Sequence, residues 1–197
     1  EFLRMEPIAE AVGVSNTPVR EGLLSLRSEG FVELVPRRGF VVAPISRQDV
    51  RDLFWTQAQL AAELAARAAK KITPEQLTKI EKLNEACEKA AQAGDREAVT
   101  HYGHHFHREI NLTADSRRLT MLLASIVRHL PNRFYASIEG QVINIHSDHP
   151  QIIEALRARN ARKARSITEK HILRGADGVI ARLEERGLWS GQTSAAS

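Results

Sequence analysis

Apolar residues recur every three or four positions in two stretches near the start of the chain, over residues 6–12 and 15–29. This spacing predicts two amphipathic helices, because residues three and four apart share one face of an α-helix. Gly13 lies between them and tolerates the left-handed backbone that ends a helix tightly. Two helices joined by so short a turn form a helix-turn-helix. The expected inward positions are Ile8, Ala9 and Val12 in the first helix, and Val19, Leu23, Leu24 and Leu26 in the second.

The start of the second predicted helix carries small and polar side chains. Ser15 is a suitable N-cap residue, and Pro18 is tolerated because first-turn amides lack an intrahelical partner. Exposed groups at this end of a recognition helix meet the phosphates and base edges of DNA. We therefore predict DNA contacts from Ser15, Asn16, Thr17 and Arg20.

After Gly30 the hydrophobic pattern becomes that of β-strands. Residues 31–35 and 40–43 are β-branched and apolar, and a Pro-Arg-Arg-Gly turn separates them. A hairpin directly after a recognition helix predicts a winged helix-turn-helix, with DNA contacts from Arg37, Arg38 and Gly39 at the tip. A solvated basic turn is the alternative, and the preceding helix-turn-helix favours the wing.

The rest of the chain follows the helical period. Ser46 and Asp49 form a capping pair for the first of these helices, and Asn160 caps the last. We expect helices over residues 46–70, 73–94, 95–110, 119–138 (broken at Pro131), 150–156 and 160–186. The predicted fold is mainly α. It comprises a winged helix-turn-helix over residues 1–45, an antiparallel all-α bundle of about six helices over 46–189, and a disordered small-residue tail over 190–197.

The formal net charge of +4 is compatible with a nucleic-acid partner. Residues 1–46, however, hold five arginines against six glutamates, so only the local placement of arginines favours DNA binding there. No long apolar run predicts a membrane span. The single cysteine, Cys87, fits a reducing cytoplasm, where we expect the protein to act.

Residues 13–23, Gly-Val-Ser-Asn-Thr-Pro-Val-Arg-Glu-Gly-Leu, together with the wing at residues 38–42, resemble the GntR family of bacterial transcriptional regulators. Two positions depart from the family pattern: Asn16 and Glu6 stand where arginine is usual. We therefore expect an unusual operator, because Asn favours adenine edges or phosphate over the guanine contact of Arg. The chain begins close to the helix-turn-helix, so we expect the first helix of the winged domain to be missing.

Two of the eight histidines lie on inward faces of predicted helices. His107 borders the stripe that contains Phe106 and Ile110, and His171 shares a face with Ala164, Ile167 and Gly175. His149 stands at the start of its predicted helix, just before Pro150. From spacing alone these residues are either three separate buried polar contacts or the ligands of one metal ion.

A winged helix followed by such a bundle is similar to the FadR-type subfamily, whose C-terminal portion is the FCD domain. Many members hold a divalent ion with one carboxylate and three histidines, and His107, His149 and His171 fall on the histidine positions. Gly103 stands in place of the carboxylate. The resemblance thus implies a Zn²⁺, Ni²⁺ or similar site with open positions. The alternative is that the histidines bind an organic carboxylate directly.

Four further positions are candidates for the effector cavity: Gln57, Gly103, Arg128 and Asn132. Gln57 interrupts an apolar stripe, where an unpaired amide is costly. The resemblance implies a ligand-responsive regulator that binds double-stranded operator DNA as a homodimer and takes a small carboxylate or sugar acid as effector. Its rivals are a metal-sensing regulator and a three-histidine hydrolase. We favour a non-enzyme, because no acid–base partner is placed beside His107 or His171.

Overall fold

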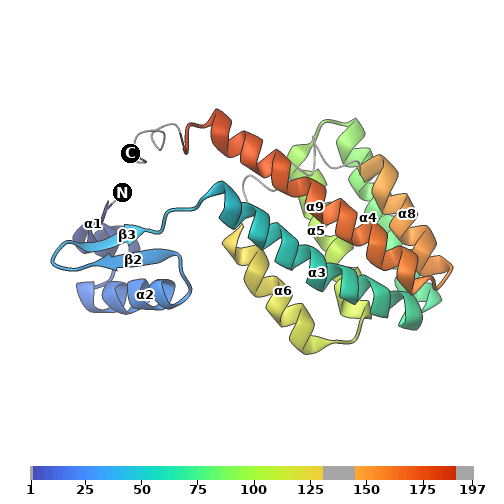
Figure 1. Ribbon diagram of the computed structural model, residues 1–197, viewed down its shortest axis with the longest axis horizontal. Helices are drawn as coiled ribbons and strands as arrows, with labels where there is room; N and C mark the ends of the chain where they lie inside the picture. The colour runs from blue at the N-terminus through green and yellow to red at the C-terminus, as the bar shows by residue number, and fades with distance from the viewer. Residues whose placement is uncertain (1, 131–144, 190–197) are drawn as a thin grey trace. The chain divides into compact units, whose positions relative to one another are not determined.

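The structure is a computed structural model that describes residues 2–130 and 145–189. The chain divides into two compact units, Glu1–Ile45 and Ser46–Ser197, which are described separately below (Figure 1).

The first unit contains the predicted helix-turn-helix. Helix α1 spans Met5–Val12 and helix α2 spans Asn16–Ser28. Gly13 ends α1 with a left-handed backbone of φ 73°, and its N–H donates to carbonyls of the last turn. Ser15 occupies the N-cap position of α2 with an extended backbone, but its side chain makes no capping hydrogen bond.

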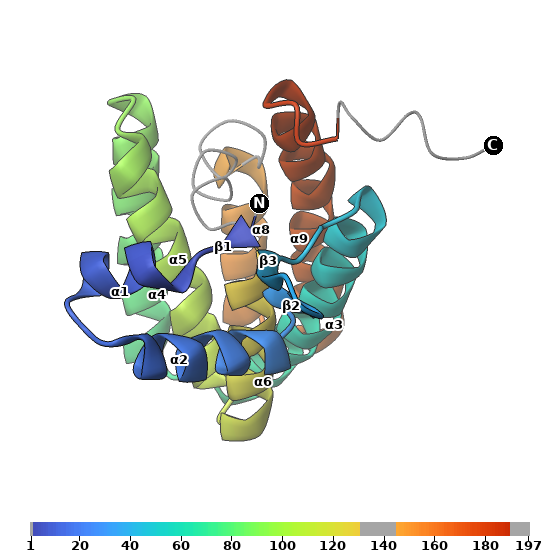
Figure 2. The same cartoon turned by 90° about the vertical axis from the view of Figure 1, so that its left-hand side faces the viewer.

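A small antiparallel sheet completes this unit (Figure 2). Strands β2 (Val32–Val35) and β3 (Gly39–Val42) form the predicted wing, with Val35 paired to Gly39. Arg37 adopts a positive φ of 64° in the turn between them. A third strand, β1 (Phe2–Leu3), pairs with β3 and was not predicted, because two residues are too short to show a period.

The core of the first unit is a single thin layer between the helices and the sheet, formed by Ala9, Val19, Leu23, Val32 and Phe40. The prediction that Leu24 and Leu26 face inward is wrong, since each keeps 40% of its surface exposed. Val12, also predicted inward, is exposed as well. A layer this thin contacts only a narrow stripe of α2.

The second unit is a helical bundle, and its described helices are α3 (Arg47–Lys71), α4 (Pro74–Gln92), α5 (Arg96–Thr113), α6 (Arg117–His129), α8 (Ile145–Arg157) and α9 (Ala161–Glu185). Helices α3 and α9 pack along each other, and so do α4 and α5 (Figure 2). The mainly α fold, with a winged helix-turn-helix followed by about six helices, is confirmed within the described residues. Among these residues, no helix is both long and apolar enough to cross a bilayer.

The caps of the bundle follow the sequence closely. Ser46 and Asp49 form a reciprocal capping box at the start of α3, and the Asn160 side chain accepts from the Lys163 N–H at the start of α9. The fifth predicted helix, however, begins earlier than expected. Helix α8 starts at Ile145 and contains Pro150 as its sixth residue. Proline removes one intrahelical hydrogen bond there, and the burial of Asp148 and His149 stabilises the helix across it. The rest of the fourth predicted helix beyond residue 130, and the predicted tail at 190–197, lie outside the described residues.

Helices α3 and α9 are in tight contact where Gly175 meets Phe54. A Cβ atom built on Gly175 would lie 2.7 Å from the Phe54 ring, and Phe54 is completely buried. Gly175→Ala is therefore expected to destabilise the bundle by about 1–3 kcal/mol through overpacking. Thermal unfolding measures the loss. In a double-mutant cycle, Gly175→Ala should destabilise a Phe54→Leu background much less than the wild type. If the losses in unfolding free energy of the two substitutions were strictly additive, the contact between these residues would be contradicted.

Candidate functional site

The bundle brings together the three histidines singled out in the sequence. His107 comes from α5, His149 from α8 and His171 from α9. One ring nitrogen from each lies within 4.8 Å of the others, and the Nε2 atoms of His171 and His107 are 3.2 Å apart. His149 and His171 are buried, whereas His107 keeps partial exposure on the side of a cavity.

His171 is oriented by a carboxylate. Its Nδ1 lies 3.1 Å from Asp148 Oδ2, which places the proton on Nδ1 and leaves the Nε2 lone pair facing the other histidines. Arg174, one turn further along α9, also donates to the Asp148 carboxylate, and so does Ser147 Oγ. The hydrogen bond from His171, reinforced by the charge of Arg174, holds the pKa of Asp148 below its ordinary value.

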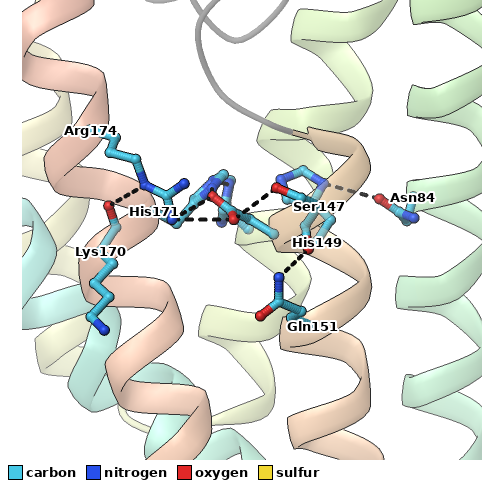
Figure 3. A network of polar contacts seen from close by, with 9 residues as sticks. Asn84, Ser147, His149, Gln151, Lys170, His171 and Arg174 are labelled. Carbon is cyan, nitrogen blue, oxygen red and sulfur yellow. Dashed lines mark hydrogen bonds and ion pairs between the residues drawn. The ribbon is translucent and has the colours of Figure 1, made fainter.

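His149 is oriented by an amide. Its Nδ1 lies 3.1 Å from Asn84 Oδ1 on α4, so Nδ1–H donates and Nε2 is left as the free nitrogen (Figure 3). The His149 ring stacks on Phe106, with centroids 4.0 Å apart. Burial lowers the pKa of both His107 and His149 well below the usual range, so these imidazoles are neutral at neutral pH.

This donor set fits a transition-metal ion. Neutral imidazoles are ligands for Zn²⁺ and Ni²⁺, and Zn–N bonds of about 2.0–2.1 Å in a tetrahedron place ligand nitrogens about 3.3 Å apart. The measured His171–His107 separation of 3.2 Å is close to this spacing. Asp148 and Asn84 supply the outer hydrogen bonds that metal-bound histidines commonly make. Gly103, one turn before His107, is buried and offers no ligand, so within the described part of the chain the set consists of three imidazoles.

A cavity of about 350 Å³ lies beside His107, between α3, α5, α6 and α9. This volume accommodates a small organic molecule. Its polar lining consists of Gln57, His104, His107, Arg108, Asn111, Thr120 and Thr168. Two of these residues carry buried polar atoms without a hydrogen-bond partner within the described residues: Gln57 Oε1 and Thr168 Oγ1. Since unpaired buried polar groups are costly, these two atoms mark where a ligand would be held.

Within the described part of the chain, one of the four residues predicted to bind an effector lines the cavity. Gln57 lines the cavity, and it is 6% exposed. Gly103 is buried within α5 and is not among the cavity residues, where His104 appears instead. Arg128 is exposed on α6 and also lies outside the cavity lining, because the inward face of α6 is formed by Thr120, Leu123 and Val127. Asn132 lies outside the described residues.

Sequence reasoning missed Thr168 and Asn84. Thr168 lies three residues before His171 and is 4% exposed, whereas Ile167, which we placed on the inward face, is half-buried. Asn84 follows Ile80 by four positions on the apolar stripe of α4 and is 6% exposed. In both cases the available signal was a polar residue at an inward helical position, the same signal that identified Gln57.

The predicted DNA-contacting residues lie on the first unit. Ser15, Asn16, Thr17 and Arg20 are exposed at the start of α2. Arg20, Arg38 and Gly39 line one concavity of about 620 Å³, together with Phe2 and neighbouring residues. The Arg38 guanidinium packs over the Phe2 ring at 4.8 Å, which holds this part of the wing tip against β1.

A winged helix-turn-helix on one unit and a ligand-sized cavity in a helical bundle on the other define a transcriptional regulator with a ligand-binding domain. Comparison with family models agrees. Residues 1–42 match the bacterial regulatory proteins of the gntR family, and residues 52–174 match the FCD domain. The chain belongs to the GntR family of transcriptional regulators, in the group that carries an FCD domain, and not to an enzyme family.

Named relatives are consistent with this class. The HTH-type transcriptional regulator McbR of Escherichia coli (strain K12) is 30% identical over 92 residues, which cover 47% of this chain and 42% of McbR. The uncharacterized HTH-type transcriptional regulator YdhC of Bacillus subtilis (strain 168) is 26% identical over 94% of this chain and 84% of its own length. The solved structure of E. coli McbR/YncC covers 94% of this chain and 87% of that chain with a TM-score of 0.69 and 24% identity, which shows a shared fold.

Proposed function

We propose that this regulator binds operator DNA through its winged unit and responds to a small hydroxylated carboxylate, such as a sugar acid, in the cavity of its helical unit. The observation that carries the proposal is the pair of unpartnered buried atoms, Gln57 Oε1 and Thr168 Oγ1, in a cavity beside His107. Hydroxyl groups of a ligand would satisfy both atoms. Arg108 and a metal ion at the three histidines are the groups that would attract a carboxylate.

We propose that His107, His149 and His171 hold a divalent ion, Zn²⁺ or Ni²⁺ by ligand type. When bound, such an ion supplies open coordination positions for a carboxylate oxygen. The protein's own contribution is orientation: Asp148 and Asn84 fix which nitrogen of His171 and His149 points inward. His107 borders the cavity, so a ligand on the ion would also reach Gln57 and Thr168.

Two helices would transmit binding to the winged unit. Helix α3 carries Gln57 and begins directly after the boundary between the units, while α9 carries Thr168 and His171. The ends of these helices are joined, because Arg47 pairs with Glu184 at 2.6 Å and its guanidinium lies 4.6 Å from the Trp189 ring. A shift of α9 against α3 would thus reach the residue next to the boundary. Regulation requires that the ligand bind two arrangements with different affinity.

We further propose that the protein acts as a homodimer in the bacterial cytoplasm. Winged and other helix-turn-helix proteins commonly read two half-sites one helical turn apart, and a two-fold dimer matches such an operator. Sedimentation of the full chain with and without operator DNA tests the stoichiometry. A single chain per operator would contradict the dimer.

The effector proposal is tested with a panel of D-gluconate, L-malate and citrate, with succinate as the matched acid that lacks a hydroxyl group. We expect at least one hydroxy acid to raise the melting temperature and to change operator affinity. Thr168→Val and Gln57→Met remove the polar atoms at similar volume and should weaken the response about tenfold or more, because a hydrogen bond of the ligand is lost. Arg128→Ala, outside the cavity, is the control and should respond as the wild type does. If Arg128→Ala lost the response to the hydroxy acid while Thr168→Val and Gln57→Met kept it, the effector would bind outside this cavity.

A metal-sensing regulator is the second candidate, and the three-histidine group itself favours it. In that case Zn²⁺ or Ni²⁺ alone would change operator affinity, without any organic acid. The same binding experiment, run with chelator-treated protein and added metal, separates the two functions.

A further inference from the structure

Helix α5 carries three further histidines besides His107. His101, His104 and His105 precede the cavity residue His107 on the same helix. An ideal helix advances about 100° per residue, so His104 and His105 lie within about 60° of His101 on either side of it. His107 lies about 240° from His101 and therefore faces another direction.

His101 and His105 are spaced by four residues, and their rings lie side by side with centroids 4.5 Å apart and planes tilted by 50°. His101 is exposed and His105 is half-buried, so both rings remain open to solvent on one side. Two histidines at this spacing on one helical face can direct a nitrogen each onto one metal ion. The Tyr102 ring contacts His101 edge-on at 5.3 Å and limits the orientations of that imidazole.

We propose that His101 and His105 form a second, surface-exposed site for a divalent transition-metal ion, distinct from the buried group of His107, His149 and His171. The site offers two imidazole nitrogens one helical turn apart, and water completes the coordination. Imidazole ligands favour Cu²⁺, Ni²⁺ and Zn²⁺ over Mg²⁺ and Ca²⁺. The site should bind Cu²⁺ more tightly than either Ni²⁺ or Zn²⁺. Two protein nitrogens hold an ion less tightly than the three of the buried group.

The proposed surface site lies on the same helix as some of the residues that line the cavity. His104 lies three residues from both His101 and His107 and is part of the cavity lining. An ion on His101 and His105 would therefore be held on the same helix as the cavity, about one to two turns from His107 along the axis.

The test is the number of Ni²⁺ ions taken up by the chelator-treated full chain, measured by titration calorimetry and by metal analysis after dialysis. The wild type should bind two ions per chain, one tightly and one more weakly. His101→Ala/His105→Ala should lose the weaker ion and keep the tighter one. His149→Ala/His171→Ala should lose the tighter ion and keep the weaker one, so failure of the buried centre is distinguishable from failure of this site.

His129→Ala is the matched control, since His129 lies on α6 outside both groups. Alanine is a strong helix former, so the surface double variant should retain its helix content by circular dichroism. Electron paramagnetic resonance of added Cu²⁺ gives a second readout, because nitrogen couplings from the surface ion should vanish in the double variant. The proposal is overturned if wild type and the double variant bind the same number of ions with equal affinity.

Discussion

Arg20→Ala is expected to weaken operator binding by about 1–3 kcal/mol, roughly fivefold to 150-fold. Arg20 is exposed near the start of α2, and within the described residues its guanidinium has no hydrogen bond or ion pair. The substitution should therefore leave the fold intact while removing a contact to a base edge or a phosphate. A duplex selected by the wild-type protein from a random pool serves as the operator in a titration followed by fluorescence anisotropy.

The matched control is Arg162→Ala, which removes the same charge from an exposed position on α9. It should bind the selected duplex within about twofold of wild type, because distant surface charge contributes little at moderate salt. The salt dependence then classifies the Arg20 contact. The slope is that of the logarithm of the binding constant against the logarithm of the salt concentration. If Arg20→Ala reduces it by about one unit, Arg20 contacts a phosphate, whereas an unchanged slope with relaxed sequence preference indicates a base contact. Unchanged affinity in Arg20→Ala would mean that α2 does not enter the groove as we propose.

Removing a ligand from the three-histidine group is expected to abolish tight metal binding. His149→Ala leaves two imidazoles where three were present, and the thermal stabilisation that low concentrations of Zn²⁺ or Ni²⁺ give through tight binding should be lost. In wild type, saturation at about 100 times the dissociation constant should add about 2.7 kcal/mol of stability. Differential scanning calorimetry with and without metal measures both quantities on the same preparation.

Asn84→Ala provides the graded comparison for that experiment. Asn84 does not face the ion but accepts from His149 Nδ1 at 3.1 Å, so its loss should weaken metal affinity about 10–100-fold without abolishing it. The order wild type, Asn84→Ala, His149→Ala is the expected ranking of affinity. Full metal occupancy in His149→Ala would contradict the three-histidine centre, and an Asn84→Ala variant that binds like wild type would contradict its orienting role.

Local chemistry in the sequence was sufficient to predict the helix-turn-helix and most helix boundaries. Gly13 is needed where the backbone turns left-handed, and Ser46 with Asp49 satisfies the free amides of a helix start. These effects depend on residues within one turn of each other, so they can be recognised without knowledge of the fold. Helical periodicity likewise placed His107 and His171 on inward faces, which the structure supports.

The failures have a common cause. Leu24 and Leu26 are apolar at helical spacing, yet among the described residues of the small winged unit no second layer covers them. Helix α8 continues through Pro150 because neighbouring residues, including Asp148 and His149, are buried against other helices. In the first case the tertiary contact that the apolar pattern implied is absent. In the second, tertiary burial outweighs the tendency of proline to end a helix.

The candidate site shows the same difference between what local sequence indicates and what tertiary packing decides. The sequence by itself indicated which side chains have the chemistry to bind a metal ion or DNA, and the helical period placed His107 and His171 on inward faces, since these features follow from residue type and spacing. Only the tertiary structure decided that His107, His149 and His171 meet, that Asn84 and Asp148 orient two of them, and that Gln57 and Thr168 share a cavity. These residues come from α3, α4, α5, α8 and α9, and the packing of helices far apart in sequence is set by the whole core rather than by any one segment.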